Sequence, residues 1–197
     1  MASSVSDRGY LPARARSVKV VVLGAFGVGK TTYVATLSEM RPLHTEERLT
    51  RAGELVDYVA VDTKSTTTVA MDFGRRTLGD GDIVVYLFGA PGQPRFAAMI
   101  RSLLTGALGG LVLVDTRYID RSYESIDLLE EAELPYVVAV NTFPGAPEYP
   151  EDALRDALTL PGDRPLVFID ARTMHSAKRA LVALVTDILR PAGSRAR

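Results

Sequence analysis

The sequence predicts a three-layer α/β fold, in which helices cover both faces of a mostly parallel six-stranded sheet with one antiparallel strand. Apolar runs rich in valine alternate with helix-like segments along residues 82–189, a pattern typical of parallel sheets with right-handed crossovers. Two strand-like runs, 66–74 and 82–89, are joined by a glycine-containing turn, which predicts an antiparallel pair. The run 17–24 is short, β-branched and ends in glycine, which predicts a buried first strand.

The remaining elements follow from local pattern. The segment 30–40 is expected to be a helix that stops before Pro42, because proline cannot continue a helix. The stretch 43–65 is polar and irregular, and loops of this length are usually functional or disordered. Further helices are expected over 94–107, 121–133, 150–160 and 175–189, and further strands over 109–115, 134–140 and 165–171.

Bulk composition indicates one soluble domain. The 197 residues are 47% hydrophobic and carry a net charge of −1, so the chain can bury a full core and has no excess charge for nucleic acid. The lack of cysteine excludes disulfides and thiolate metal sites. We expect a flexible N-terminal arm (1–16), a single domain (17–190) and a C-terminal tail (191–197). No apolar run approaches the roughly 18 residues of a membrane helix, so we expect a cytoplasmic protein with no transmembrane segment.

The segment from Gly24 to Thr31 fits the phosphate-loop pattern G-x-x-x-x-G-K-[ST] without a mismatch, between a predicted strand and a predicted helix. Glycines allow the backbone N–H groups to turn inward, and the helix N-terminus adds further donors to an anion. The lysine is expected to meet the β- and γ-phosphates, and the threonine hydroxyl suits Mg²⁺. The expected nucleotide-binding residues here are Gly24, Ala25, Phe26, Gly27, Val28, Gly29, Lys30, Thr31 and Thr32.

The segment Gly89–Gln93 follows a predicted strand, where Ras-like GTPases carry D-x-x-G-Q. Gly92 would give its N–H to the γ-phosphate, and Gln93 would orient the attacking water. We therefore take Gln93 and Lys30 as the candidate catalytic residues. The alternative is a simple Pro-Gly turn with an exposed glutamine.

The strings GAFGVGKTT, TTTVAMDFGR, LFGAPGQ, LVLVDTR and FIDAR occur in an order and spacing that resemble the actinobacterial conservon-type GTPases. These are relatives of the Mgl-type polarity GTPases, and the resemblance covers roughly residues 17–190. It implies a Ras-like P-loop NTPase that binds GTP and GDP with Mg²⁺ and hydrolyses GTP slowly. It also implies a Roadblock-type partner and a sensor-kinase-like complex, with peripheral membrane association only through such partners.

By position in that family, Thr68 is the switch I threonine that reaches Mg²⁺, and the 43–65 stretch is switch I. The alternative for Thr68 is a β-branched strand residue. The family carries no Asp at the position of Gly89, and Asp72 is a substitute for it, since Thr68 and Asp72 share one strand face. The alternative is a surface carboxylate. The candidate metal residues are therefore Thr31, Thr68 and Asp72.

The base-recognition motif N-K-x-D appears as Asn141-Thr-Phe143-Pro144, in which proline cannot accept hydrogen bonds from guanine. Asn141, Phe143 and the segment Asp170-Ala171-Arg172 are the remaining candidate base contacts. Arg172 either stacks on the base or is a surface arginine. Because of Pro144, the choice between guanine and adenine is the weakest part of the GTPase interpretation.

Hydrolysis is expected to be slow, because Thr67 stands where Mgl-type proteins carry an arginine. Arg95 is an alternative donor. Two other functions compete with the switch: a non-hydrolysing, nucleotide-dependent interaction module, and an ATP-binding P-loop protein in which Asp115 orients the metal. His44 and His175 are isolated and are not expected to be ligands.

Overall fold

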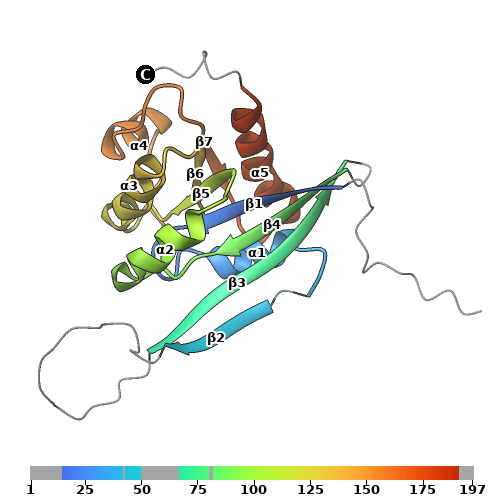
Figure 1. Ribbon diagram of the computed structural model, residues 1–197. Coiled ribbons are helices and arrows are strands. Elements are labelled where there is room, and N and C mark those ends of the chain that lie inside the picture. The colour runs from blue at the N-terminus through green and yellow to red at the C-terminus, as the bar shows by residue number, and fades with distance from the viewer. Residues whose placement is uncertain (1–14, 42, 50–66, 80–81, 191–197) are drawn as a thin grey trace, which may run out of the picture.

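A computed structural model describes residues 15–41, 43–49, 67–79 and 82–190, with backbone alone for 43–49, 67–70 and 94. Its sheet has seven strands in the order β2-β3-β4-β1-β5-β6-β7 (Figure 1). β3 runs antiparallel to both of its neighbours, and the other described strands run parallel to one another. The predicted fold class, with one antiparallel strand, is confirmed, but the sheet has one strand more than the six predicted, because β2 was not expected.

The strands and the helices have the following bounds, each set in chain order. The strands are β1 (Arg16–Leu23), β2 (Leu43–Leu49), β3 (Thr67–Leu78), β4 (Ile83–Gly89), β5 (Gly109–Val114), β6 (Tyr136–Asn141) and β7 (Leu166–Ile169). The helices are α1 (Lys30–Leu37), η1 (Pro94–Phe96), α2 (Ala97–Leu104), η2 (Ile119–Ser122), α3 (Tyr123–Glu131), α4 (Glu151–Ala157) and α5 (Met174–Leu189), where η denotes a 3-10 helix.

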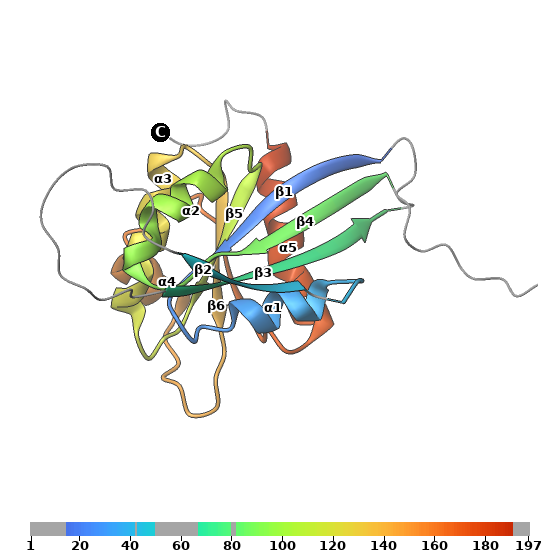
Figure 2. The same ribbon diagram turned by 60° about the horizontal axis from the view of Figure 1, so that its bottom comes forward.

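Alternation along the strands builds two cores, one on each face of the sheet. In β1, Val20 and Val22 face α1 and α5, whereas Val21 and Leu23 face α2, α3 and α4. Figures 1 and 2 show these two helical layers around the central strands. β5 and β6 are buried along their whole length, as continuous apolar runs in a doubly covered parallel sheet should be.

Three expectations about element bounds were wrong. The stretch 43–65 is not irregular throughout, because Leu43–Leu49 forms the edge strand β2, paired with β3; residues 50–66 lie outside the described part. β3 continues to Leu78, so the turn is shorter than predicted. α1 ends at Leu37, where Ser38 becomes extended, rather than just before Pro42.

The parallel strands end at one edge of the sheet, and the loops that follow β1, β4, β5, β6 and β7 meet there. In α/β sheets this carboxyl edge is where ligands bind. None of the helices in the described ranges is long and apolar enough to cross a bilayer.

Candidate functional site

The phosphate loop wraps tightly because its glycines take backbone angles that other residues avoid. Gly24 has φ +133, and a Cβ there would stand 2.5 Å from the carbonyl oxygen of Leu113. Gly29 has φ +101 and lies against the side-chain amide of Asn141. Val28, between them, is buried in the core on the α1 side and anchors the loop to the sheet. The predicted loop therefore has the wrapped path that phosphate binding needs.

Lys30 begins α1 with its ammonium group inside the loop. Nζ donates hydrogen bonds to the carbonyl oxygens of Gly24 and Ala25, both at 2.8 Å. The residue is only 8% exposed. Burial lowers the pKa of Lys30 to about 8, against a smaller opposing effect of the Asp72 carboxylate. An ammonium group has three donors, so one more remains for a phosphate oxygen.

Thr31 and Asp72 meet beside the loop, although they are far apart in the chain. Thr31 Oγ1 donates to Asp72 Oδ2 at 2.6 Å, and Asp72 is buried. The alternative of an exposed strand carboxylate for Asp72 is therefore wrong. Asp72 pairs across the ladder with Gly89, where a Cβ would lie 2.9 Å from the Asp72 Cβ. The carboxylate on β3 thus fills the space that a side chain at the end of β4 would need.

The Thr31 hydroxyl and the Asp72 carboxylate are oxygen ligands of the kind that Mg²⁺ prefers. Magnesium usually keeps several waters and takes one or two carboxylates together with substrate phosphates. In the described part of the chain, no group of three or more His, Cys, Asp or Glu residues could hold a metal alone. Thr31 and Asp72 would therefore hold the ion jointly with the nucleotide. Thr68 lies in β3 on the same strand face, but its side chain is not among those described, and its metal role stays a prediction.

The 89–93 segment packs directly on the phosphate loop. A Cβ at Gly92 would stand 2.5 Å from the backbone nitrogen of Phe26 and 2.6 Å from Lys30 Nζ, so only glycine fits. Gln93 and Phe26, which is 76% exposed, line a cavity of about 460 Å³ beside the loop. Arg121 lines this cavity as well. Gln93 therefore lies next to the phosphate loop, and its role in orienting water stays a prediction.

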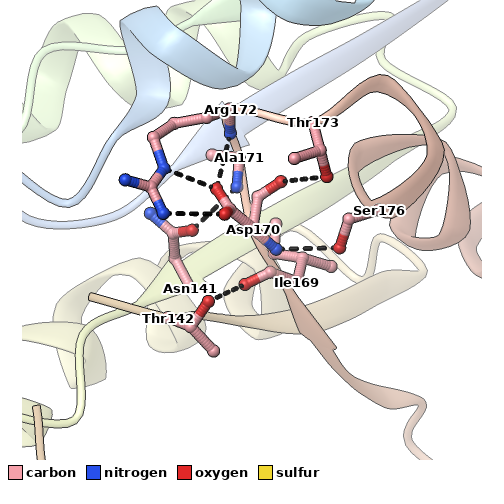
Figure 3. A network of polar contacts seen from close by, with 8 residues as sticks. All are labelled: Asn141, Thr142, Ile169, Asp170, Ala171, Arg172, Thr173 and Ser176. Atoms are coloured by element: carbon pink, nitrogen blue, oxygen red, sulfur yellow. Dashed lines mark hydrogen bonds and ion pairs between the residues drawn. The ribbon is translucent and has the colours of Figure 1, made fainter. Parts of the chain in front are cut away.

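Asn141 ties the phosphate loop to the loop after β7. Its Nδ2 donates to the carbonyl of Val28 at 2.9 Å, and its Oδ1 accepts from the N–H of Ala171 at 2.9 Å; the second of these hydrogen bonds is drawn in Figure 3. The Asn141 side chain and the Ala171 N–H, both expected to contact the base, thus bind protein groups here. Their contact with a base stays a prediction. The segment after β7 is further fixed by Ser176, whose hydroxyl accepts from the Asp170 N–H at 2.8 Å.

Two strand ends carry the same D-x-R arrangement. In each, the arginine guanidinium forms a bidentate pair with the aspartate two residues earlier: Arg172 with Asp170 after β7, and Arg117 with Asp115 after β5. Hydrogen bonds from Arg172 lower the pKa of Asp170 to about 2. Burial raises the pKa of Asp115, but its hydrogen bonds with Arg117 outweigh this and lower it. The Asp115 carboxylate thus pairs with Arg117, whereas Asp72 reaches the Thr31 hydroxyl.

A cavity of about 100 Å³ opens beside Asn141, between the loops after β6 and β7. Phe143 and Pro144 line it together with Thr32 of α1, so the predicted base contacts gather around one hollow. Arg172 lines the cavity as well and is largely exposed, with Asp170 as its ion-pair partner. The Arg117 guanidinium lies 4.2 Å from the centre of the Phe143 ring.

Sequence reasoning missed the arginines of the site rim. Arg117 lies over the Phe143 ring, and Arg121 lines the larger cavity together with residues of the phosphate loop. The repeated D-x-R after two strands is the signal that could have identified the first of them. Arg95, considered as a catalytic donor, is exposed and lies 5.0 Å from the Phe96 ring, and it is not among the residues that line the larger cavity.

Comparison with known proteins gives consistent results. The model of the family described as "Conserved hypothetical ATP binding protein" matches residues 22–191. The uncharacterized protein MJ1339 of Methanocaldococcus jannaschii is 34% identical over 126 residues, which cover 63% of this chain and 69% of that protein. Among solved structures, the cytosolic domain of the T. maritima FeoB iron transporter in apo form has a TM-score of 0.62 at 19% identity. The match covers 89% of this chain and 66% of that one, and it shows the fold.

We predict that Asn141→Ala destabilises the protein by about 2–4 kcal/mol, because it leaves the buried Val28 carbonyl and Ala171 N–H unpaired. Urea unfolding measures this. Thr142→Ala is the matched control: it loses one partly buried side-chain hydrogen bond to the Ile169 carbonyl, which still accepts from the Thr142 N–H, and it should change stability by less than about 1 kcal/mol. Equal losses in the two variants would show that Asn141 does not hold the two loops together.

We also predict that nucleotide affinity falls as pH rises above 8. The Lys30 ammonium then loses its proton in the free protein, so phosphate binding must take a proton up. The decline should approach about tenfold per pH unit. Titration calorimetry with MgATP and MgGTP between pH 7.5 and 9.5 measures it. Lys30→Arg keeps its charge throughout and should lose the slope; an identical slope in this variant would assign the proton to another group.

Proposed function

The chain belongs to the family of conserved hypothetical ATP-binding proteins, and on this premise we propose that it is a small nucleotide-dependent switch. It binds Mg²⁺-GTP and GDP through Gly24–Thr32 and hydrolyses GTP slowly. Family and fold support the binding of a nucleotide, and the site geometry and the conservon resemblance support the finer proposal.

The close approach of Gly92 to Lys30 is the observation that most directly supports a switch function. The loop that holds the phosphates and the segment that would sense the terminal phosphate touch each other with no room for a side chain. A γ-phosphate that bonds Lys30 must therefore act on the position of the 89–93 segment. Coupling of this kind converts the phosphorylation state of the nucleotide into a change of conformation.

The chemistry would be in-line attack of water on the γ-phosphate. Gln93 would orient the water from its place beside the phosphate loop, and Lys30 would stabilise the charge that develops on the phosphoryl oxygens. The metal held by Thr31 and Asp72, when bound, would supply further charge neutralisation. Thr67 offers no guanidinium, so the rate would be low without a partner.

The resemblance favours a Roadblock-type protein as that partner, within a sensor-kinase-like complex. Single-turnover hydrolysis of GTP, measured with and without such a partner, tests the switch against the non-hydrolysing module. Cleavage in either sample supports the switch. No cleavage in both would leave a nucleotide-dependent interaction module.

An ATP-binding protein is the second candidate function, because no free carboxylate is among the described residues that line the smaller cavity beside Asn141. Pro144 has no acceptor in its side chain, and the Asp170 carboxylate is bound by Arg172. The family description also names ATP. Guanine selectivity would then have to come from backbone groups, which competition between ATP and GTP for a labelled nucleotide can measure.

Gln93→Leu should bind nucleotide with unchanged affinity and hydrolyse it about 10- to 100-fold more slowly, because leucine cannot hold the attacking water. Single-turnover rates together with equilibrium affinities measure both properties. Arg95→Ala is the companion variant, and it should stay within about twofold of the native rate, since Arg95 lies over Phe96. Native turnover in Gln93→Leu would remove Gln93 from the mechanism.

Pro144→Asp should raise the preference for GTP over ATP by a factor of about ten to several hundred, because each charged hydrogen bond to guanine contributes roughly 1.5–3 kcal/mol. Competition binding with the two triphosphates gives the ratio. Pro144→Ala removes proline without adding an acceptor and should leave the ratio unchanged. If Pro144→Asp behaves like Pro144→Ala, the residue is remote from the base.

A further inference from the structure

The described sheet ends at β7, on the side farthest from β2, and α5 runs beside it (Figure 1). The Pro165 carbonyl accepts a hydrogen bond from the N–H of Val138 in β6, and the Ile169 carbonyl accepts one from the N–H of Thr142, directly after β6. In a parallel ladder, backbone groups alternate between the two sides of a strand, so those of Leu166 and Phe168 face away from β6. At Phe168, which is 37% exposed, this last edge of the described sheet can pair with another extended chain.

A groove of about 450 Å³ lies between the edge strand and α5. Its apolar part is formed by Val167 from β7 and by Val182 and Ala183 from α5. Val182 is 57% exposed, whereas Leu181 and Leu184 beside it on the same helix are buried. A strand added to β7 would place alternate side chains in this groove.

The rest of the groove is basic. His175, Lys178 and Arg179 line it, and no carboxylate is among its lining residues in the described part of the chain. None of the three forms an ion pair with any described residue, in contrast to Arg172 and Arg164 near the two ends of β7. Basic side chains without an ion-pair partner, beside the apolar part of the groove, favour a ligand that carries carboxylates next to apolar side chains.

We propose that the free edge of β7, together with the basic groove between β7 and α5, binds an extended acidic segment of a partner protein by strand addition. Main-chain hydrogen bonds to Leu166 and Phe168 would give affinity, and carboxylates facing Lys178 and Arg179 would give specificity. The proposal is independent of nucleotide hydrolysis, because it uses neither the phosphate loop nor the 89–93 segment.

The probe is a fluorescent ten-residue peptide in which every second residue is threonine and the others alternate between glutamate and valine. Glutamate and valine then share one strand face and can meet α5 together. Fluorescence anisotropy with the full chain should show saturable binding that weakens with salt. No saturable binding would overturn the proposal.

Charge reversal tests the specificity. The double variant Lys178→Glu/Arg179→Glu should bind the peptide at least about tenfold more weakly, and it should gain affinity for a peptide with lysine in place of glutamate. That gain also shows that the variant is folded. The matched control Arg16→Glu/Arg41→Glu makes the same change of charge at exposed residues away from β7 and should leave affinity within about twofold. Equal weakening in both double variants would contradict the site.

Backbone methylation tests the strand addition. Two peptides are methylated on alternate amide nitrogens, one in each frame, and only one frame should abolish binding, because alternate residues of an added strand face β7. Equal affinities in the two frames would overturn strand addition. Phosphatidylserine vesicles give a further outcome: charge-dependent binding to the vesicles without peptide binding would assign the groove to a membrane surface instead.

Discussion

The buried ammonium group of Lys30 is the constraint on which the rest of the site depends. A lysine that is taken out of water must be surrounded by oxygen, and here the loop carbonyls of Gly24 and Ala25 supply it. Those carbonyls turn toward the ammonium only because the glycines of the loop take left-handed angles. The same compact loop leaves no room for a side chain at Gly92, so the segment after β4 touches it. The phosphate loop and the segment that we propose to sense the terminal phosphate thus share one small volume.

The site also shows how a missing residue of a pattern can be replaced from a neighbouring strand. Gly89 stands where Ras-like proteins carry an aspartate, and the ladder pairs it with Asp72. The carboxylate reaches the Thr31 hydroxyl from β3 because Gly89 has no side chain to compete for the space. A strand alternation visible in the sequence identified Asp72 as a candidate metal residue, but only the register between β3 and β4 shows that its carboxylate is buried beside Thr31 and does not lie at the surface.

Local pattern predicted the parallel strands, their helices and the phosphate loop, because each depends on residues close in sequence. β2 was missed since its residues, LHTEERL, are mostly polar and form a strand through pairing with β3. The double role of Asn141 was also invisible, because its partners Val28 and Ala171 come from distant loops. The D-x-R pairs need the turn geometry at a strand end, which spacing alone does not fix.

Titration calorimetry of Mg²⁺-GTP, Mg²⁺-GDP and Mg²⁺-ATP with the native chain and with Lys30→Ala tests whether the phosphate loop and Lys30 bind a nucleotide. We expect the native chain to bind at least one nucleotide with micromolar or tighter affinity. In the variant, this affinity should fall by about a hundredfold or more, because a charge-assisted contact inside the loop is removed. A native chain that binds none of the three nucleotides, or a folded variant that binds as tightly as the native chain, would contradict it.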